Sequence, residues 1–168
     1  VVDEYGTDAL RYFLLREISS FEDSPFTLER FKEAYNANLA NGLGNLVSRI
    51  MKMVTAYEVA YDIFGEEEML VKFEALYQKD LEAFNIKNVM DSIWERIGIL
   101  DRKIAEEKPF MYWKDEPQRA KATVATLVIF LDEIAFSLRP FLPETSESIR
   151  VLIREKKMPE TPLFLRKD

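Results

Sequence analysis

The sequence predicts an all-α fold, a helical bundle of about five helices. Apolar residues recur every three or four positions along most of the 168-residue chain, which is the period of an amphipathic helix. No alternating apolar and polar pattern is long enough to indicate a strand. Proline and glycine are scarce, at 7 and 5 residues, as in an ordinary folded protein.

The first half of the chain predicts two helices. Thr7 is expected to cap a helix that ends near Glu17, with one face formed by Leu10, Phe13 and Leu14. Thr27 is expected to cap the next and longest helix, which ends beyond Tyr57. Its buried stripe is predicted to consist of Tyr35, Leu39, Leu43, Leu46, Ile50, Val54 and Tyr57. The chain is therefore expected to be organised around this long helix.

The second half predicts three further long helices and a short one. The first opens at Glu66, and its buried stripe is predicted to be Leu70, Phe73, Leu76, Tyr77 and Leu81. Asn85 is expected to cap the second, which Pro109 ends and which buries Val89, Ile93, Ile97, Leu100 and Ile104. After a loop over residues 109–118, the helix at 120–138 is apolar almost all round and should be central. A short helix at 144–154 and an extended tail follow.

Composition excludes several classes of chemistry. The chain has no cysteine and no histidine, which excludes disulfides, Ser-His-Asp catalysis and the commonest zinc sites. No glycine-rich phosphate loop follows a strand, and no carboxylate pairs with a histidine at metal-binding spacing. We therefore predict no catalysis, no metal and no cofactor for the isolated chain. No apolar run is long enough to span a membrane.

The net charge of −7 argues against a nonspecific nucleic-acid binder, but it leaves room for a local site that reads a few exposed nucleotides. One candidate is a second stripe on the long helix, formed by Asn38, Asn41, Asn45, Arg49 and Lys52. Side-chain amides followed by an arginine suit the polar edge of a base. Spacing alone favours a solvated face instead, with Gly42 and Gly44 present for close helix packing.

A second candidate is the aromatic segment from Pro109 to Trp113. Exposed aromatic rings after a helix end can stack on unpaired bases. The alternative is that Phe110, Tyr112 and Trp113 cover the end of the bundle, and spacing alone favours this alternative.

Several segments resemble one family. YGTDALRYFLLREI and EDSPFTLERFKEAYNANLANGLGNLVSR resemble methionyl-tRNA synthetases after their catalytic KMSKS loop, and KIAEEKPF, LRPFLPETSESI and PLFLR recur there in the same order. The resemblance covers essentially the whole chain. The HIGH and KMSKS signatures are absent, so the chain is expected to be a C-terminal piece of such an enzyme.

The resemblance implies a site that binds the CAU anticodon of a tRNA. The family's Asn-x-x-x-Arg pattern stands here as Asn45 and Arg49, which would read the wobble cytosine. The family's Pro-Trp pair stands as Pro109 and Phe110, with Trp113 as an alternative stacking residue. Asn38, Asn41 and Asp101 are expected to support the site, and Asp101 replaces the family's usual asparagine.

The resemblance also implies a domain organisation and partners. Residues 1–26 would end a stem-contact module, residues 27–158 would form the anticodon-binding bundle and residues 159–168 an extended tail. The expected partners are the tRNA and the catalytic domain of a cytoplasmic, ATP-dependent methionine–tRNA ligase, with no membrane. Pro162 to Arg166 are expected to pack on the stem-contact module or on that catalytic domain. The alternative function is a helical protein–protein interaction module without RNA binding.

Overall fold

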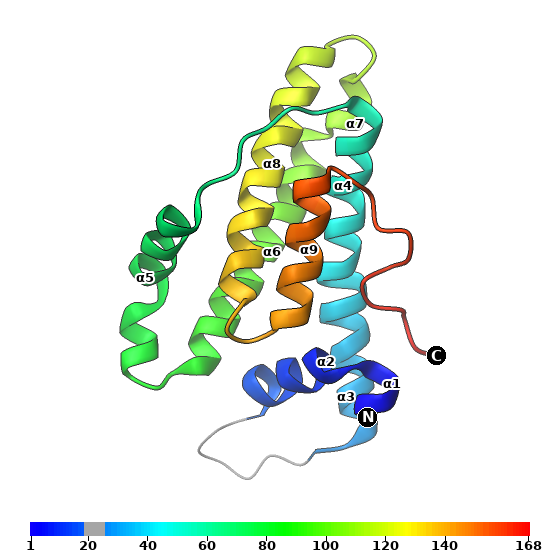
Figure 1. The fold of residues 1–168 in the computed structure, drawn as a ribbon. Helices are drawn as coiled ribbons and strands as arrows, with labels where there is room; N and C mark the ends of the chain where they lie inside the picture. The colour runs from blue at the N-terminus through cyan, green and yellow to red at the C-terminus, as the bar shows by residue number, and fades with distance from the viewer. Residues whose placement is uncertain (19–25) are drawn as a thin grey trace.

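The computed structural model describes residues 1–18 and 26–168, and within those ranges it contains helices and no strand (Figure 1). The predicted all-α fold is confirmed. The elements are α1 (Val2–Tyr5), α2 (Thr7–Tyr12), η1 (Phe13–Glu17), α3 (Leu28–Ala34), η2 (Tyr35–Gly44), α4 (Asn45–Tyr57), α5 (Glu66–Glu82), α6 (Ile86–Glu107), α7 (Pro109–Tyr112), α8 (Pro117–Leu138) and α9 (Pro143–Glu155), where η marks a π-helix.

The long helix is built from α3, η2 and α4, which follow one another without a break. The Thr27 side chain accepts a hydrogen bond from the Arg30 backbone N–H at 3.2 Å, so the predicted cap is confirmed. The predicted stripe is buried along its whole length, at Tyr35, Leu39, Leu43, Leu46, Ile50, Val54 and Tyr57.

The middle of this helix is not an α-helix. A π-helix forms its hydrogen bonds from residue i to residue i+5, so each residue turns the chain by less than the 100° of an α-helix. The predicted polar stripe from Asn38 to Lys52 assumed 100° throughout, and η2 interrupts it. Only its members on α4 keep α-helical spacing.

The centre of the bundle is α8, which packs against α4, α6 and α9 (Figure 1). Most of its apolar side chains are buried, which confirms the prediction that the helix at 120–138 is central. It begins three residues earlier than predicted, because Pro117 occupies the first helical turn, where a missing N–H costs nothing. Asp132 lies on its buried side and accepts a hydrogen bond from Arg150 of α9 at 3.1 Å.

α6 follows its prediction closely. The Asn85 side chain caps it by accepting from the Asn88 N–H at 3.4 Å, and the whole predicted stripe is buried. The helix ends at Glu107, and Lys108 has a left-handed backbone with φ of 45°. The predicted loop at 109–118 is wrong in its first part, because Pro109 starts the short helix α7.

Two predictions for the first helical segment, residues 7–17, are wrong. Thr7 is the first residue of α2 and not its cap, because Gly6, with φ of 87°, already separates α1 from α2. Leu14 is exposed, since the chain becomes π-helical at Phe13 and turns that side chain away from the face that buries Ala9.

α5 buries a narrower stripe than predicted. Leu70 and Leu76 are exposed, whereas Met69 and Tyr77 are buried. The helix lies on the outside of the bundle and packs mainly against α6 and α8 (Figure 1). Lys72 of α5 forms an ion pair with the carboxylate of Glu133 on α8 at 2.8 Å.

The C-terminal tail runs back along η2. The Asn36 side chain donates to the Lys167 carbonyl at 2.7 Å and accepts from the Lys167 N–H at 2.9 Å, and the Tyr35 hydroxyl donates to the Leu165 carbonyl at 3.0 Å. Phe164 packs edge-on against Tyr35 and lies next to Gly44, where an added Cβ would come within 3.1 Å of the Leu39 carbonyl oxygen. Among residues 1–18, Tyr5 lies under the Lys167 ammonium group, and Tyr5, Gly6, Asp8 and Ala9 line a pocket together with Leu163 and Phe164, so the tail also reaches the segment on which it was predicted to pack.

We expect Phe164→Ala to lower the free energy of unfolding by about 1–2 kcal/mol, because the side chain is partly buried against the core. Urea unfolding measures the change. Leu165→Ala is the matched control and should stay within about 0.5 kcal/mol, since Leu165 is exposed. Equal stability of the two variants would show that the tail does not dock.

Candidate functional site

One cavity lies at the end of the bundle away from α1 and α2, where α4, α6 and α7 meet (Figure 1). Its volume is about 340 Å³, within the range of about 300–1,000 Å³ that is usual for ligand pockets. The lining residues are Arg49, Lys52, Met53, Ala56, Tyr57, Ile104 and Phe110. The first five come from a single face of α4 because they follow helical spacing.

Arg49 provides the main hydrogen-bond donor at this cavity. Its Nη1 donates to Asp101 Oδ1 of α6 at 2.6 Å, and the two side chains are 44% and 54% exposed. Asn45 is exposed four residues earlier on α4, which places it on the same face as Arg49. The two predicted reading residues therefore lie on one face of α4, where Asp101 pairs with Arg49; of the three, only Arg49 lines the cavity itself.

Phe110 provides an exposed aromatic ring. It follows Pro109, which is buried at the start of α7 and fixes where that helix begins. Phe110 is 52% exposed and lines the same cavity as Arg49. An exposed ring beside hydrogen-bond donors is the arrangement that stacking on a base requires.

Trp113 has a different environment. Its ring is stacked on Tyr57 with centroids 4.1 Å apart and planes 12° apart, and it is partly buried against the core. It is not a lining residue of the cavity. Lys121 lies 5.9 Å from its ring centroid. Trp113 therefore supports the floor of the cavity by holding Tyr57.

Asn38 and Asn41 do not join the site. They lie eleven and eight residues before Arg49, on the π-helical segment η2, and neither lines the cavity. Asn36, which belongs to the same asparagine-rich segment, holds the tail instead.

The cavity combines cations with an apolar floor. Arg49 and Lys52 supply positive charge at its rim, although the chain as a whole carries −7. Burial, and to a smaller extent Tyr112, raises the pKa of Tyr57, so its hydroxyl stays neutral at pH 7. Sequence reasoning missed that Tyr57 and Ile104 form this floor. The spacing of Arg49, Lys52 and Ala56 on one helix face could have indicated it.

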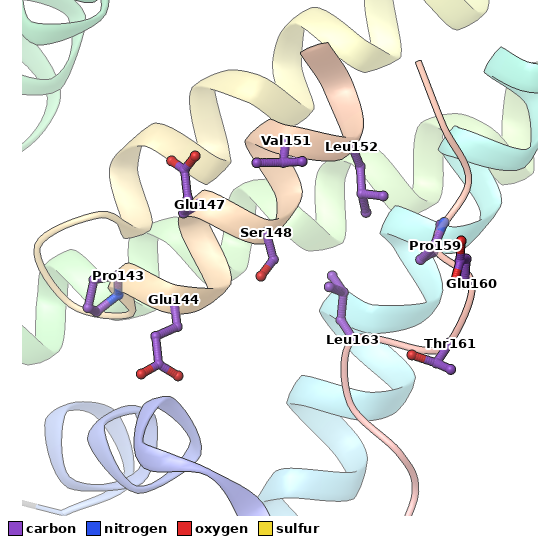
Figure 2. A pocket seen from close by; sticks show the side chains of 10 residues that line it. All are labelled: Pro143, Glu144, Glu147, Ser148, Val151, Leu152, Pro159, Glu160, Thr161 and Leu163. Carbon is purple, nitrogen blue, oxygen red and sulfur yellow. The ribbon is translucent and has the colours of Figure 1, made fainter. Parts of the chain in front are cut away.

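A larger groove of about 670 Å³ lies between α9 and the tail (Figure 2). Its walls include the apolar residues Leu152 and Leu163, and its three charged lining residues are Glu144, Glu147 and Glu160. None of its ten lining residues is basic. A negative groove repels phosphate, so this groove does not suit a nucleic acid.

Residues 1–18 and 26–168 contain no group of three or more histidine, cysteine or acidic side chains that could hold a metal ion. No helix in the described ranges is both long and apolar enough to cross a membrane.

Comparisons with known proteins give one consistent family. The family described as class I tRNA synthetases (M) matches residues 1–51. The methionine–tRNA ligase of Clostridium acetobutylicum is 35% identical over 161 residues, covering 89% of this chain and 25% of the relative. The Listeria monocytogenes enzyme is 35% identical over 161 residues, which cover 89% of this chain and 24% of the relative. Methionine–tRNA ligase 1 of Bacillus anthracis is 34% identical over 154 residues, which cover 84% of this chain and 23% of the relative. The chain thus spans about a quarter of the length of these relatives.

Solved structures show the same fold. The methionyl-tRNA synthetase of Mycobacterium tuberculosis in complex with methionyl-adenylate has a TM-score of 0.71 at 24% identity, covering 90% of this chain and 32% of that chain. The apo form of that enzyme has a TM-score of 0.77 at 22% identity, covering 99% of this chain and 40% of that chain. The helical arrangement is therefore shared with these enzymes.

Proposed function

The chain is homologous to the C-terminal part of methionyl-tRNA synthetases, and on this premise we propose that it is the tRNA-binding part of a methionine–tRNA ligase. The proposed parent joins methionine to its tRNA with ATP, in a catalytic domain elsewhere in the longer protein. The bundle described above binds the anticodon CAU.

The observation that carries the proposal is the cavity shared by Arg49 and Phe110. Cytosine presents two acceptors, N3 and O2, beside the N4 amino donor. Arginine and asparagine side chains can donate to those acceptors, while Phe110 stacks on the ring. Hydrogen bonds and stacking dominate such a site, which is compatible with the net charge of −7.

We expect Arg49→Gln to weaken binding of a CAU anticodon stem-loop by about 1–3 kcal/mol and to relax preference at the wobble base. The measurement is a titration of stem-loops that differ only at that base. Arg154→Gln is the matched control, because Arg154 is also 44% exposed and also forms a 2.6 Å ion pair, with Glu147 on α9. Unchanged base preference in Arg49→Gln would refute the assignment of Arg49.

The second candidate function is a protein–protein interaction module. It is favoured by four exposed apolar side chains on and just after α5, namely Leu70, Val71, Leu76 and Phe84. The same titration separates the two functions, since failure of the wild-type chain to bind any stem-loop would favour a protein partner.

A further inference from the structure

The ion pair between Arg49 and Asp101 leaves most of its hydrogen-bonding groups unused. A guanidinium has five N–H donors and a carboxylate has about four acceptor sites, whereas the pair uses one of each in its 2.6 Å contact. Both side chains are roughly half exposed, and Arg49 lines the cavity that Phe110 also lines. A flat ring on Phe110 could therefore place its edge against both charged groups.

The pair presents a particular order of groups. The Asp101 carboxylate is an acceptor, and the adjacent Arg49 guanidinium offers a row of donors. Guanine presents the same order to cytosine in a base pair, namely the O6 acceptor followed by the N1–H and N2–H donors. Cytosine offers the complement, with its N4 donor followed by the N3 and O2 acceptors.

We propose that Asp101 is a specificity-determining residue that accepts a hydrogen bond from the N4 amino group of cytosine and rejects uracil. This inference rests on the function proposed above and deepens it. Uracil turns its O4 acceptor toward the carboxylate and its N3–H donor toward the guanidinium. Both contacts are repulsive, so the pair discriminates by exclusion as well as by attraction.

The contact is at the surface, and surface ion pairs contribute little to folding. Asp101→Asn should therefore leave the melting temperature almost unchanged. The substitution should instead change the choice between cytosine and uracil, because an asparagine amide can rotate and donate to O4 of uracil, which a carboxylate cannot do.

The test compares three stem-loops with cytosine, uracil or 2-pyrimidinone at the wobble position, titrated by fluorescence anisotropy into the wild-type chain and into Asp101→Asn. The 2-pyrimidinone ring is cytosine without the amino group. We expect wild type to bind the cytosine loop about tenfold or more tightly than either of the others. Asp101→Asn should reduce the cytosine preference over uracil to about threefold or less, mainly by binding uracil better. Glu147→Gln, which removes the acid of the Arg154 pair on α9, should leave the ratio unchanged.

Two results overturn the role of Asp101 while leaving the proposed function intact. One is an unchanged cytosine preference in Asp101→Asn, and the other is equal wild-type affinity for the cytosine and 2-pyrimidinone loops. The second result needs no variant, so it holds even if Asp101→Asn folds poorly. If the wild-type chain binds none of the three loops, the proposed function and this inference both fail.

Discussion

Replacing Arg150 with alanine is expected to destabilise the fold by about 3–5 kcal/mol, because it would leave a buried carboxylate without its counter-charge. The Asp132 side chain on α8 is 1% exposed, and Arg150 on α9 is 11% exposed. Asp132 Oδ1 accepts from Arg150 Nε at 3.1 Å, and Oδ2 has no hydrogen-bond partner in the described part of the chain. The pair thus joins the central helix to α9 where water cannot replace the arginine.

Urea unfolding measures this loss, and Arg154→Ala is its control. Arg154 is on the same helix and exposed, so its loss should cost less than about 1 kcal/mol. The double variant Asp132→Leu, Arg150→Met should be close to wild type, because an apolar pair of similar volume avoids the desolvation cost. A loss below about 1 kcal/mol in Arg150→Ala would contradict the prediction.

The contribution of the Asp132–Arg150 pair to the free energy of unfolding should depend on pH, and the direction of that dependence can be derived. Burial raises the pKa of Asp132, and the attraction of Arg150 opposes that rise. The folded state therefore holds this proton more tightly than the unfolded state does. The cost of the ionised form is fully present above the folded pKa, declines as the pH falls below it, and is gone below the pKa of the unfolded state. Without Arg150 the pKa of Asp132 rises further, so the deficit of Arg150→Ala should shrink as the pH is lowered toward the ordinary pKa of an aspartic acid.

The buried faces of the regular helices could be predicted from the sequence. The stripes of α4 and α6 follow the α-helical period because each packs against α8 along its length. Thr27 and Asn85 were identified as caps from their position before an apolar stripe. Local chemistry decides these features, so a local pattern is enough to find them.

Features that depend on distant contacts could not be predicted. Nothing in the period of Tyr35 to Gly44 indicates a π-helix, and nothing in it indicates that Asn36 and Gly44 contact the tail. The exposure of Leu70 on α5 depends on how far that helix stands from α8, which its own sequence does not encode.

At the candidate site, residue types were easier to predict than their pairing. Resemblance indicated Arg49 and Phe110, and the structure places both on one cavity. Asp101 was expected only to support the site, and its contact with Arg49 depends on the packing of α4 against α6. The roles of these residues in binding stay predictions.

The final prediction distinguishes the two aromatic residues of α7 and its C-cap. We expect Trp113→Ala to lower the free energy of unfolding by about 2–3 kcal/mol, which is less than the 3–5 kcal/mol of a fully buried ring because Trp113 is only partly buried. The loss arises from its stacking on Tyr57. Phe110→Ala should change stability by less than about 0.5 kcal/mol, since that ring is exposed.

For stem-loop binding we expect the reverse, with a larger loss in Phe110→Ala than in Trp113→Ala. Phe110→Ala removes the ring that lines the cavity beside Arg49, and should weaken stem-loop binding by about 1–3 kcal/mol. Trp113→Ala, measured well below its melting temperature, should bind nearly as tightly as wild type. Phe110→Tyr is the conservative control and should retain stacking. If instead Trp113→Ala proved stable but defective in binding, the base would stack on Trp113, and the Tyr57 contact seen here would have to open when RNA binds.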